Sequence, residues 1–236
     1  MCVIRNPFAR TACLVMALVG KHVLPVAVGF GAFGLGSAVH AGLMLSISIN
    51  GGAPIVVQDN GAGDTNPAPN AITYNSTIIG FALSSITATT NDPGNPTSGF
   101  VSGSQVLFQN TGNTPITVAV TPSDTGFTSP TGTRRLESDF SASLVTPGAG
   151  DFASLVSTAN ATSTPTQTLT ASGANSVIVP FGDAGVYSLK NVTTARLSPG
   201  ATDFLTSTTS VIVPEPTSIG LLVFGALGLL ARRRRK

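Results

Sequence analysis

Short extended segments dominate the middle of the chain. Between Gly42 and Val213, runs of alternating apolar and polar residues recur about every 8–14 residues and end at clusters of Gly, Pro, Asn or Asp. The alternation is clearest where Leu136, Phe140 and Leu144 are separated by polar residues. A period of two is typical of half-buried strands, and closely spaced turns join such strands antiparallel. The pattern predicts a single antiparallel β-sandwich, Ig-like or jelly-roll in architecture.

Turn clusters set the limits of the expected strands. Residues 121–133 are expected to be irregular, and residues 152–157 fit either a strand or a short helix. No amphipathic helix of ordinary length is expected between residues 42 and 213. Residues 71–80 and 81–90 fit two strands or one long bent pair, residues 162–171 fit a threonine-rich extended segment, and residues 203–213 lead to the tail with 207–210 as a polar spacer or a final strand. The other strands are expected over residues 45–49, 54–58, 100–109, 115–121, 134–145, 176–181 and 185–197.

Charged residues are scarce and gather at the two ends of the chain. Only 9% of the 236 residues are charged, against about a quarter in an average protein. The whole chain has a formal net charge of +2, yet residues 42–213 carry four cations and nine anions. Nucleic-acid binding needs a basic patch on the folded domain. The net negative charge of the middle argues against a nucleic-acid partner.

Cysteine and histidine are confined to the first 41 residues, as Cys2, Cys13, His22 and His40. The remaining domain can therefore form no disulfide framework and no His/Cys zinc site. It also has no Cys nucleophile and no Ser-His-Asp triad. Only carboxylate, Tyr, Lys or Arg chemistry is left, so no cofactor and no enzymatic activity are expected.

Residues 1–41 have the three parts of an export leader. Basic residues come first, an apolar region covers residues 23–36, and Val39 and Ala41 form the small-residue pattern of a signal-peptidase site. The alternative is an uncleaved transmembrane anchor. The basic residues are Arg5, Arg10 and Lys21.

The last two dozen residues combine a rigid motif, an apolar segment and a basic end. The motif is Val213, Pro214, Glu215 and Pro216. The apolar segment is apolar all round, which is unlike a helix on the surface of a soluble domain and typical of a membrane helix. Five terminal cations would hold that helix with its end in the cytoplasm. The membrane helix is expected to use Ile219, Leu221, Leu222, Val223, Phe224, Leu227, Leu229 and Leu230, and the cytoplasmic stop Arg232, Arg233, Arg234 and Arg235.

This tail resembles the PEP-CTERM sorting signal of certain Gram-negative bacteria over residues 213–236. The resemblance implies recognition by an exosortase, a membrane-embedded transpeptidase thought to cut near the Pro-Glu-Pro motif. It also implies a link to exopolysaccharide and the cell surface or biofilm. Because that family shares a tail and no common body, the resemblance implies nothing about the fold or activity of residues 42–212.

Two clusters of acidic and amide residues could bind a cation. The segment Asp59–Asp64 has the oxygen ligands and glycines of a calcium loop but lacks the spacing and the closing Glu of an EF-hand, and turn formation is the favoured explanation. Asp92 and Asn95 are a weaker cluster of the same kind.

Glu137 and Asp139 are two residues apart on one expected strand and should share a face. Such a pair suits glycosidase chemistry, but the chain has no Trp and only two Tyr, Tyr74 and Tyr187, to form a sugar platform. A solvated face, with surface ion pairs to Arg134 and Arg135, is the favoured interpretation.

Sugar attachment is a further possibility that the sequence leaves open. The pattern N-x-[ST] occurs at Asn75, Asn160 and Asn191, close to chance in a chain so rich in Ser and Thr. The threonine tract 162–170 could carry O-linked sugar.

These features predict three parts: a signal peptide over residues 1–41, a secreted β-sandwich over residues 42–212 and a sorting signal over residues 213–236. The expected protein is exported and non-enzymatic. It is held at the inner membrane as an intermediate and then released to the surface or outside the cell, where it contacts polysaccharide. The alternatives are a permanently anchored periplasmic domain and a secreted carboxylate enzyme acting on glycans.

Overall fold

The computed structural model describes residues 42–214, apart from residues 76, 79–80, 84 and 183–184. The expected leader, with Val39 and Ala41, lies outside the described residues. So do Glu215, Pro216, the expected membrane helix and the terminal arginines. Within the described part every regular element is a strand, and none is a helix long and apolar enough to cross a membrane.

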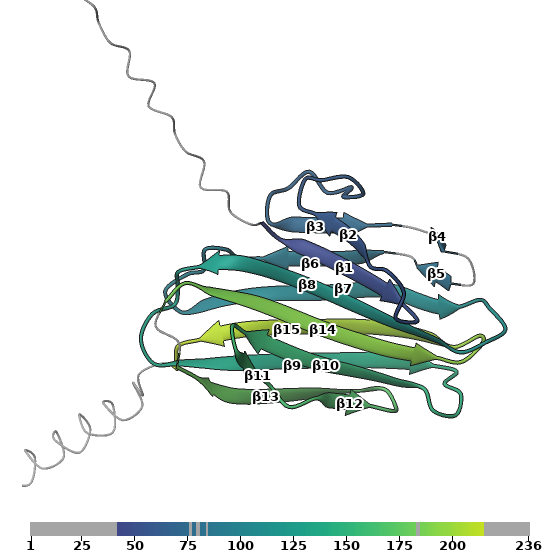
Figure 1. Ribbon diagram of the computed structural model, residues 1–236. Coiled ribbons are helices and arrows are strands. Elements are labelled where there is room, and N and C mark those ends of the chain that lie inside the picture. Colours follow the sequence, from purple (N-terminus) through teal and green to yellow (C-terminus); the bar gives the residue numbers. More distant parts are fainter. Residues whose placement is uncertain (1–41, 76, 79–80, 84, 183–184, 215–236) are drawn as a thin grey trace, which may run out of the picture. The chain divides into compact units, whose positions relative to one another are not determined.

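Two antiparallel sheets build the domain (Figure 1). Sheet A has seven strands in the order β11-β10-β14-β8-β1-β2, with β12 also paired to β10. Its strands are β1 (Met44–Ile49), β2 (Ile55–Gln58), β8 (Ile116–Phe127), β10 (Phe152–Ala159), β11 (Thr162–Ser163), β12 (Gln167–Leu169) and β14 (Tyr187–Leu197).

Sheet B has eight strands in the order β13-β9-β15-β7-β5-β4, and β6 pairs with both β7 and β3. The long strands β9, β15 and β7 form its centre, and β13 is an edge strand. The strands are β3 (Ala71–Tyr74), β4 (Thr77–Ile78), β5 (Phe81–Leu83), β6 (Ile86–Thr90), β7 (Ser98–Asn110), β9 (Arg134–Val145), β13 (Gly173–Phe181) and β15 (Thr202–Ile212).

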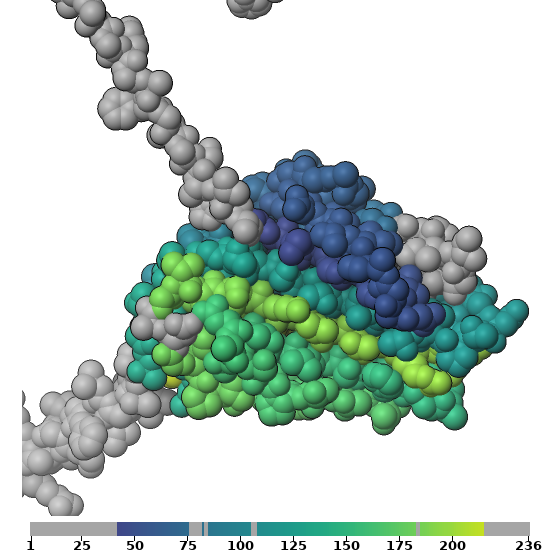
Figure 2. Space-filling view, viewed as in Figure 1, coloured from purple at the N-terminus to yellow at the C-terminus, as the bar shows by residue number. Residues whose placement is uncertain are grey.

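Alternation along each strand places one set of side chains between the sheets. In β9 the residues Leu136, Phe140 and Leu144 are buried, and their sequence neighbours face outward. Leu45 and Leu189 of sheet A join them in one hydrophobic core. The outer side of sheet A shows the side chains of its strands as adjacent bands (Figure 2). The prediction of an all-β protein with two packed antiparallel sheets is confirmed.

Two local predictions need correction or refinement. Residues 121–127 were expected to be irregular, but they continue β8 as far as Phe127. Pro122 is tolerated inside the strand because β14 pairs with Val120 and Ser123 but skips residues 121 and 122, so the missing amide is not needed on that side. On the other side Pro122 is buried opposite Leu45. The ambiguous segment 152–157 is part of the strand β10. Pairing with β14 on one side and with β11 and β12 on the other overrides any helical tendency of these residues.

Several hydroxyl groups lie between the sheets. Ser157 of β10 has its Oγ 2.7 Å from Ser138 Oγ of β9 and 2.6 Å from Thr209 Oγ1 of β15. Thr193 of β14 donates a hydrogen bond to Ser207 of β15 at 3.0 Å. All five side chains are buried. Because buried polar groups need partners, these bonds favour one alignment of the two sheets.

An aromatic cluster closes one end of the interior. Tyr187 stacks on Phe127 with ring centroids 5.2 Å apart and meets Phe181 edge to face at 5.5 Å. The Arg134 guanidinium lies 4.8 Å from the centre of the Phe181 ring and 5.3 Å from that of Tyr187. Gly99 is required beside them, since a Cβ at this position would collide with the Tyr187 hydroxyl and crowd Phe127.

Candidate functional site

Strand register brings polar side chains from three strands together on the outer face of sheet B. Asp139 of β9 pairs with Ser176 of β13 on one side and with Thr208 of β15 on the other. One step along the sheet, Ser141 pairs with Thr206. Residues opposite one another in a sheet share a face. These side chains therefore form two short polar rows that cross the sheet.

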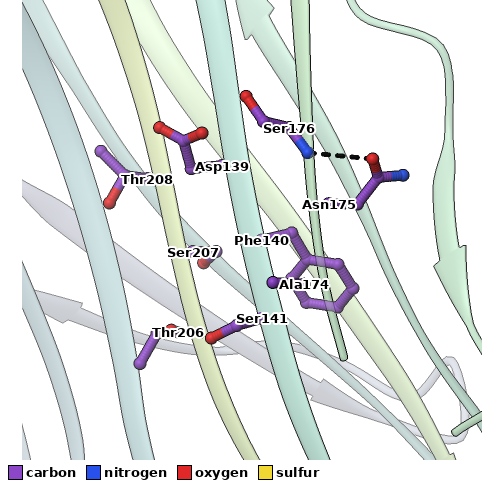
Figure 3. A pocket seen from close by; sticks show the side chains of 9 residues that line it. All are labelled: Asp139, Phe140, Ser141, Ala174, Asn175, Ser176, Thr206, Ser207 and Thr208. Carbon is purple, nitrogen blue, oxygen red and sulfur yellow. Dashed lines mark hydrogen bonds between the residues drawn. The ribbon is translucent and has the colours of Figure 1, made fainter. Parts of the chain in front are cut away.

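A shallow groove of about 390 Å³ lies over these rows (Figure 3). Most of its lining residues face outward, whereas Phe140 and Ser207 belong to the buried faces of β9 and β15. Figure 3 shows that the carboxylate of Asp139 and the hydroxyls of Ser141, Thr206 and Thr208 come from adjacent strands. The lining residues are Asp139, Phe140, Ser141, Ala174, Asn175, Ser176, Thr206, Ser207 and Thr208.

Neighbouring strands hold several of the groove's polar groups in place. The Ser141 and Thr206 hydroxyls bond to each other in a short hydrogen bond. The Thr208 hydroxyl lies 3.1 Å from Ser102 Oγ. The Ser176 amide donates to the Asn175 side chain at 2.9 Å. A surface of hydroxyl and amide groups ordered in this way, with the exposed Asp139 carboxylate beside them, can form several hydrogen bonds to a polyhydroxylated chain.

Glu137 and Asp139 share the outer face of β9, as their spacing predicted. Partial burial raises the pKa of Glu137, and the negative charge of Asp139 raises it further. Arg134 departs from the prediction of a surface ion pair, because alternation along the strand turns it inward and leaves it only 5% exposed. Arg135 faces outward. The pair of acids lies on an open face, and only Asp139 borders the groove.

The Asp59–Asp64 loop uses its carboxylates to order its own backbone. Asp59 accepts a hydrogen bond from the Asn70 amide at 2.8 Å. Asp64 accepts from the amides of Asn60, Asn66 and Thr73. Although burial raises the pKa of Asp64, these amides outweigh it and lower the pKa below its usual value. In the part of the chain that is described, no three acidic, His or Cys side chains gather as a metal site.

In the weaker cluster, the Asn95 side chain also orders the backbone of its own loop. The Asn95 side chain accepts hydrogen bonds from the amides of Thr97 at 3.0 Å and Ser98 at 2.8 Å. Asp92 and Asn95 follow β6 at the turn that leads into β7.

The three possible glycosylation sites differ in access. Asn75 and Asn160 are exposed, although the Asn160 side chain accepts hydrogen bonds from the Ser188 amide and hydroxyl. Asn191 is fully buried between the sheets, so it cannot carry a sugar in the folded protein. The tract 162–170 is not uniformly exposed either, since Thr164 and Gln167 are buried.

The expected sorting motif starts where the last strand ends. Ile212 is the final residue of β15, and the Val213 amide donates to the Thr97 carbonyl at 3.1 Å. Val213 and Pro214 are partly buried. The first two motif residues are therefore held against the folded domain.

Comparison with known families decides the nature of this segment. Residues 213–236 match the PEP-CTERM protein-sorting motif. The match covers the tail alone, in agreement with the resemblance seen in the sequence. The motif implies export, a membrane-anchored sorting intermediate and processing by a transpeptidase of the exosortase type.

The body of the chain gives only a distant comparison. Among solved structures it is similar to TmCBM61, described in complex with β-1,4-galactotriose, at 7% identity and a TM-score of 0.31. That similarity covers 53% of this chain and 86% of the other. A likeness at this level carries no argument about function. No match was found among curated proteins.

Sequence reasoning identified Asp139 but missed the rest of the groove. Ala174, Ser176, Thr206 and Thr208 were not singled out, because each is an ordinary residue of a polar strand face. The consecutive Ser and Thr residues of segment 206–210 were the available signal. That signal does not reveal which strands lie beside β15.

Proposed function

We propose that this protein is an exported, non-enzymatic component of the cell surface or extracellular matrix, released through its C-terminal sorting motif. The observation that carries this proposal is the PEP-CTERM motif at residues 213–236, directly after the last strand of the domain. The β-sandwich is the cargo that the tail delivers. Outside the cell, the groove on sheet B contacts exopolysaccharide. Binding this polysaccharide is the role proposed for the domain in a biofilm.

The groove supports a binding role because of its shape and its groups. It is open and shallow, which suits a long chain lying across the strands. Hydroxyl and amide groups line it, and they match sugar hydroxyls as hydrogen-bond partners. Asp139 is the one charged group in its lining. Each hydrogen bond gained there would contribute about 0.5–1.5 kcal/mol.

Sorting is tested by replacing Pro214, Glu215 and Pro216 with Ala in the full chain, expressed in its native host. The two prolines hold the motif extended and Glu215 supplies its charge, so we expect the released product to fall at least tenfold. Intact mass and the C-terminal peptide are measured in membrane and extracellular fractions. Changing the exposed Thr111 and Thr114, at the opposite end of the domain, to Ala is the control.

The wild-type product is itself informative. An extracellular form ending near Pro214–Pro216 supports sorting by cleavage. A mature form that still ends at Lys236 in the membrane overturns it and establishes the permanently anchored domain instead.

Polysaccharide binding is tested with a variant in which Asp139, Thr206 and Thr208 are all Ala. Losing three hydrogen-bonding groups is expected to weaken binding to the host's purified exopolysaccharide at least tenfold, measured by affinity gel electrophoresis. The matched control changes Ser123, Lys190 and Thr194 on the outer face of sheet A to Ala. Equal binding by both variants, or none by the wild type, contradicts the assigned groove. New reducing ends in the polysaccharide would identify a glycan-cleaving enzyme.

A further inference from the structure

Strand β15 fixes the chain up to the residue before the sorting motif. It lies between β7 and β9, and its last residue, Ile212, pairs with Ser98 on one side and Arg135 on the other. Val211 is fully buried. Releasing these residues would break backbone hydrogen bonds to two strands and expose core side chains.

The domain and the motif are joined without a spacer. Val213 is the first residue of the matched motif and is also tied to the Thr97 carbonyl. An enzyme that reads the motif therefore meets its first two residues, Val213 and Pro214, at the surface of the folded sandwich.

Covalent geometry limits the room for that enzyme. Five residues separate Val213 from Ile219, the start of the apolar segment. A fully extended chain advances at most about 3.3–3.6 Å per residue, so Val213 lies within roughly 20 Å of that segment. A small folded domain has a diameter of about 30 Å. A transpeptidase working at the motif must therefore contact the end of the sandwich beside Val213.

This end, which we call the exit end, consists of loop 91–97, loop 128–133 and Val213. Hydrogen bonds join the two loops. The Pro93 carbonyl accepts hydrogen bonds from the amides of Thr128 and Ser129, each at 3.1 Å. The Tyr187 hydroxyl donates to the Ser129 carbonyl. Gly94 has φ +88° and leaves no room for a side chain against Ser129. A surface fixed in this way loses little entropy on binding.

The start of the domain lies toward the same end. Strand β8 runs from the opposite end to Phe127 at the exit end, and Met44, the first residue of β1, pairs with Ser123 near the end of β8. The chain therefore enters and leaves the domain on the side of the exit end. This arrangement is suited to an end that faces the membrane.

We propose that the exit end is a docking surface for the membrane-embedded sorting transpeptidase, which recognises the motif together with the adjoining loops. The inference rests on the proposed sorting function. The folded domain thereby takes part in its own sorting, and the processed product keeps β15 whole.

A spacer tests the joint recognition. Nine Gly and Ser residues are inserted between Val213 and Pro214 of the full chain in the native host. Separating the motif from the loops is expected to reduce the cleaved fraction at least fivefold, measured by intact mass. The same nine residues inserted between Asn113 and Thr114, in the β7–β8 turn at the opposite end, form the control. Unchanged or increased cleavage with the first insertion overturns the proposal.

A surface variant tests the loops without changing the tail. Thr131 and Thr133 are exposed in loop 128–133, and changing both to Glu is expected to lower the cleaved fraction at least threefold. The matched control places Glu at the exposed Thr111 and Thr114 at the opposite end. Thermal unfolding of both proteins checks that the fold is kept. Equal cleavage of the two variants contradicts docking at the exit end.

The motif variant separates the two proposals. If replacing Pro214–Pro216 leaves processing unchanged, the proposed sorting function fails. If that variant is blocked while the spacer and loop variants are processed normally, sorting stands and docking at the exit end is wrong.

Discussion

Replacing Tyr187 with Ala is expected to lower the free energy of unfolding by about 3–5 kcal/mol, the range found when a large buried aromatic is truncated. Tyr187 is only 1% exposed and contacts the rings of Phe127 and Phe181. Its loss would leave a cavity at the exit end and remove one of the rings that face the buried Arg134 guanidinium. Chemical denaturation followed by circular dichroism measures the change.

A conservative variant separates packing from hydrogen bonding. Tyr187→Phe keeps the ring and removes only the hydroxyl that donates to the Ser129 carbonyl. A typical hydrogen bond contributes about 0.5–1.5 kcal/mol, so this variant should lose about that amount. Equal losses for the Ala and Phe variants would contradict the packing explanation and place the stability in the hydroxyl alone.

Replacing Asp203 with Asn is expected to stabilise the protein by about 2–4 kcal/mol at pH 8 and to have little effect near pH 4. Asp203 is fully buried, with Phe108 and Leu144 as its strand partners. Burial raises the pKa of its carboxyl to about 7, although the backbone amides of Phe204 and Ser143 lower it somewhat. In the described structure neither amide forms a hydrogen bond of ordinary geometry with the carboxylate.

The direction of the pH dependence follows from proton binding. Between about pH 4 and pH 7 the folded state holds a proton on Asp203 that the unfolded chain has released. The contribution of Asp203 to stability is therefore greatest below about pH 4 and is lost as the pH rises through about 7. Above that pH the carboxylate is charged, and the folded state carries the full free-energy cost of burying that charge.

The measurement is the difference in unfolding free energy between wild type and Asp203→Asn at several pH values. Using the difference removes the contributions of groups that both proteins share, such as Glu137. Asp139→Asn, on the outer face of sheet B, serves as the exposed control. A difference that stays constant from pH 4 to pH 8 would show that the buried carboxyl titrates normally.

Much of the strand pattern was predictable because a half-buried strand repeats every two residues. In β9 the alternation of Leu136, Phe140 and Leu144 with polar residues predicted both the strand and its inner face. Residues 121–127 were misjudged because Pro and Gly usually end a strand. Here Pro122 is buried opposite Leu45, so packing outweighed local preference.

The candidate groove was less predictable because it depends on strands that are distant in sequence. Ser102 of β7 donates to the Ser207 carbonyl of β15, 105 residues away. Asp139 could be placed on an outer face from sequence, but its neighbours Ser176 and Thr208 follow only from the register of β13 and β15.

The sequence by itself determined that the domain is all-β and that its tail carries a sorting motif, since both depend on residues adjacent in the chain. The tertiary structure decided which polar groups are buried and which meet at the surface. Arg134 and Asp203 lie inside, whereas Phe204 is 42% exposed. The tertiary structure also shows that the motif follows β15 directly, with Val213 bonded to the domain. Such placements depend on the packing of both sheets together, because a strand such as β15 carries apolar and polar residues on both faces, so its alternation does not decide which face becomes the core.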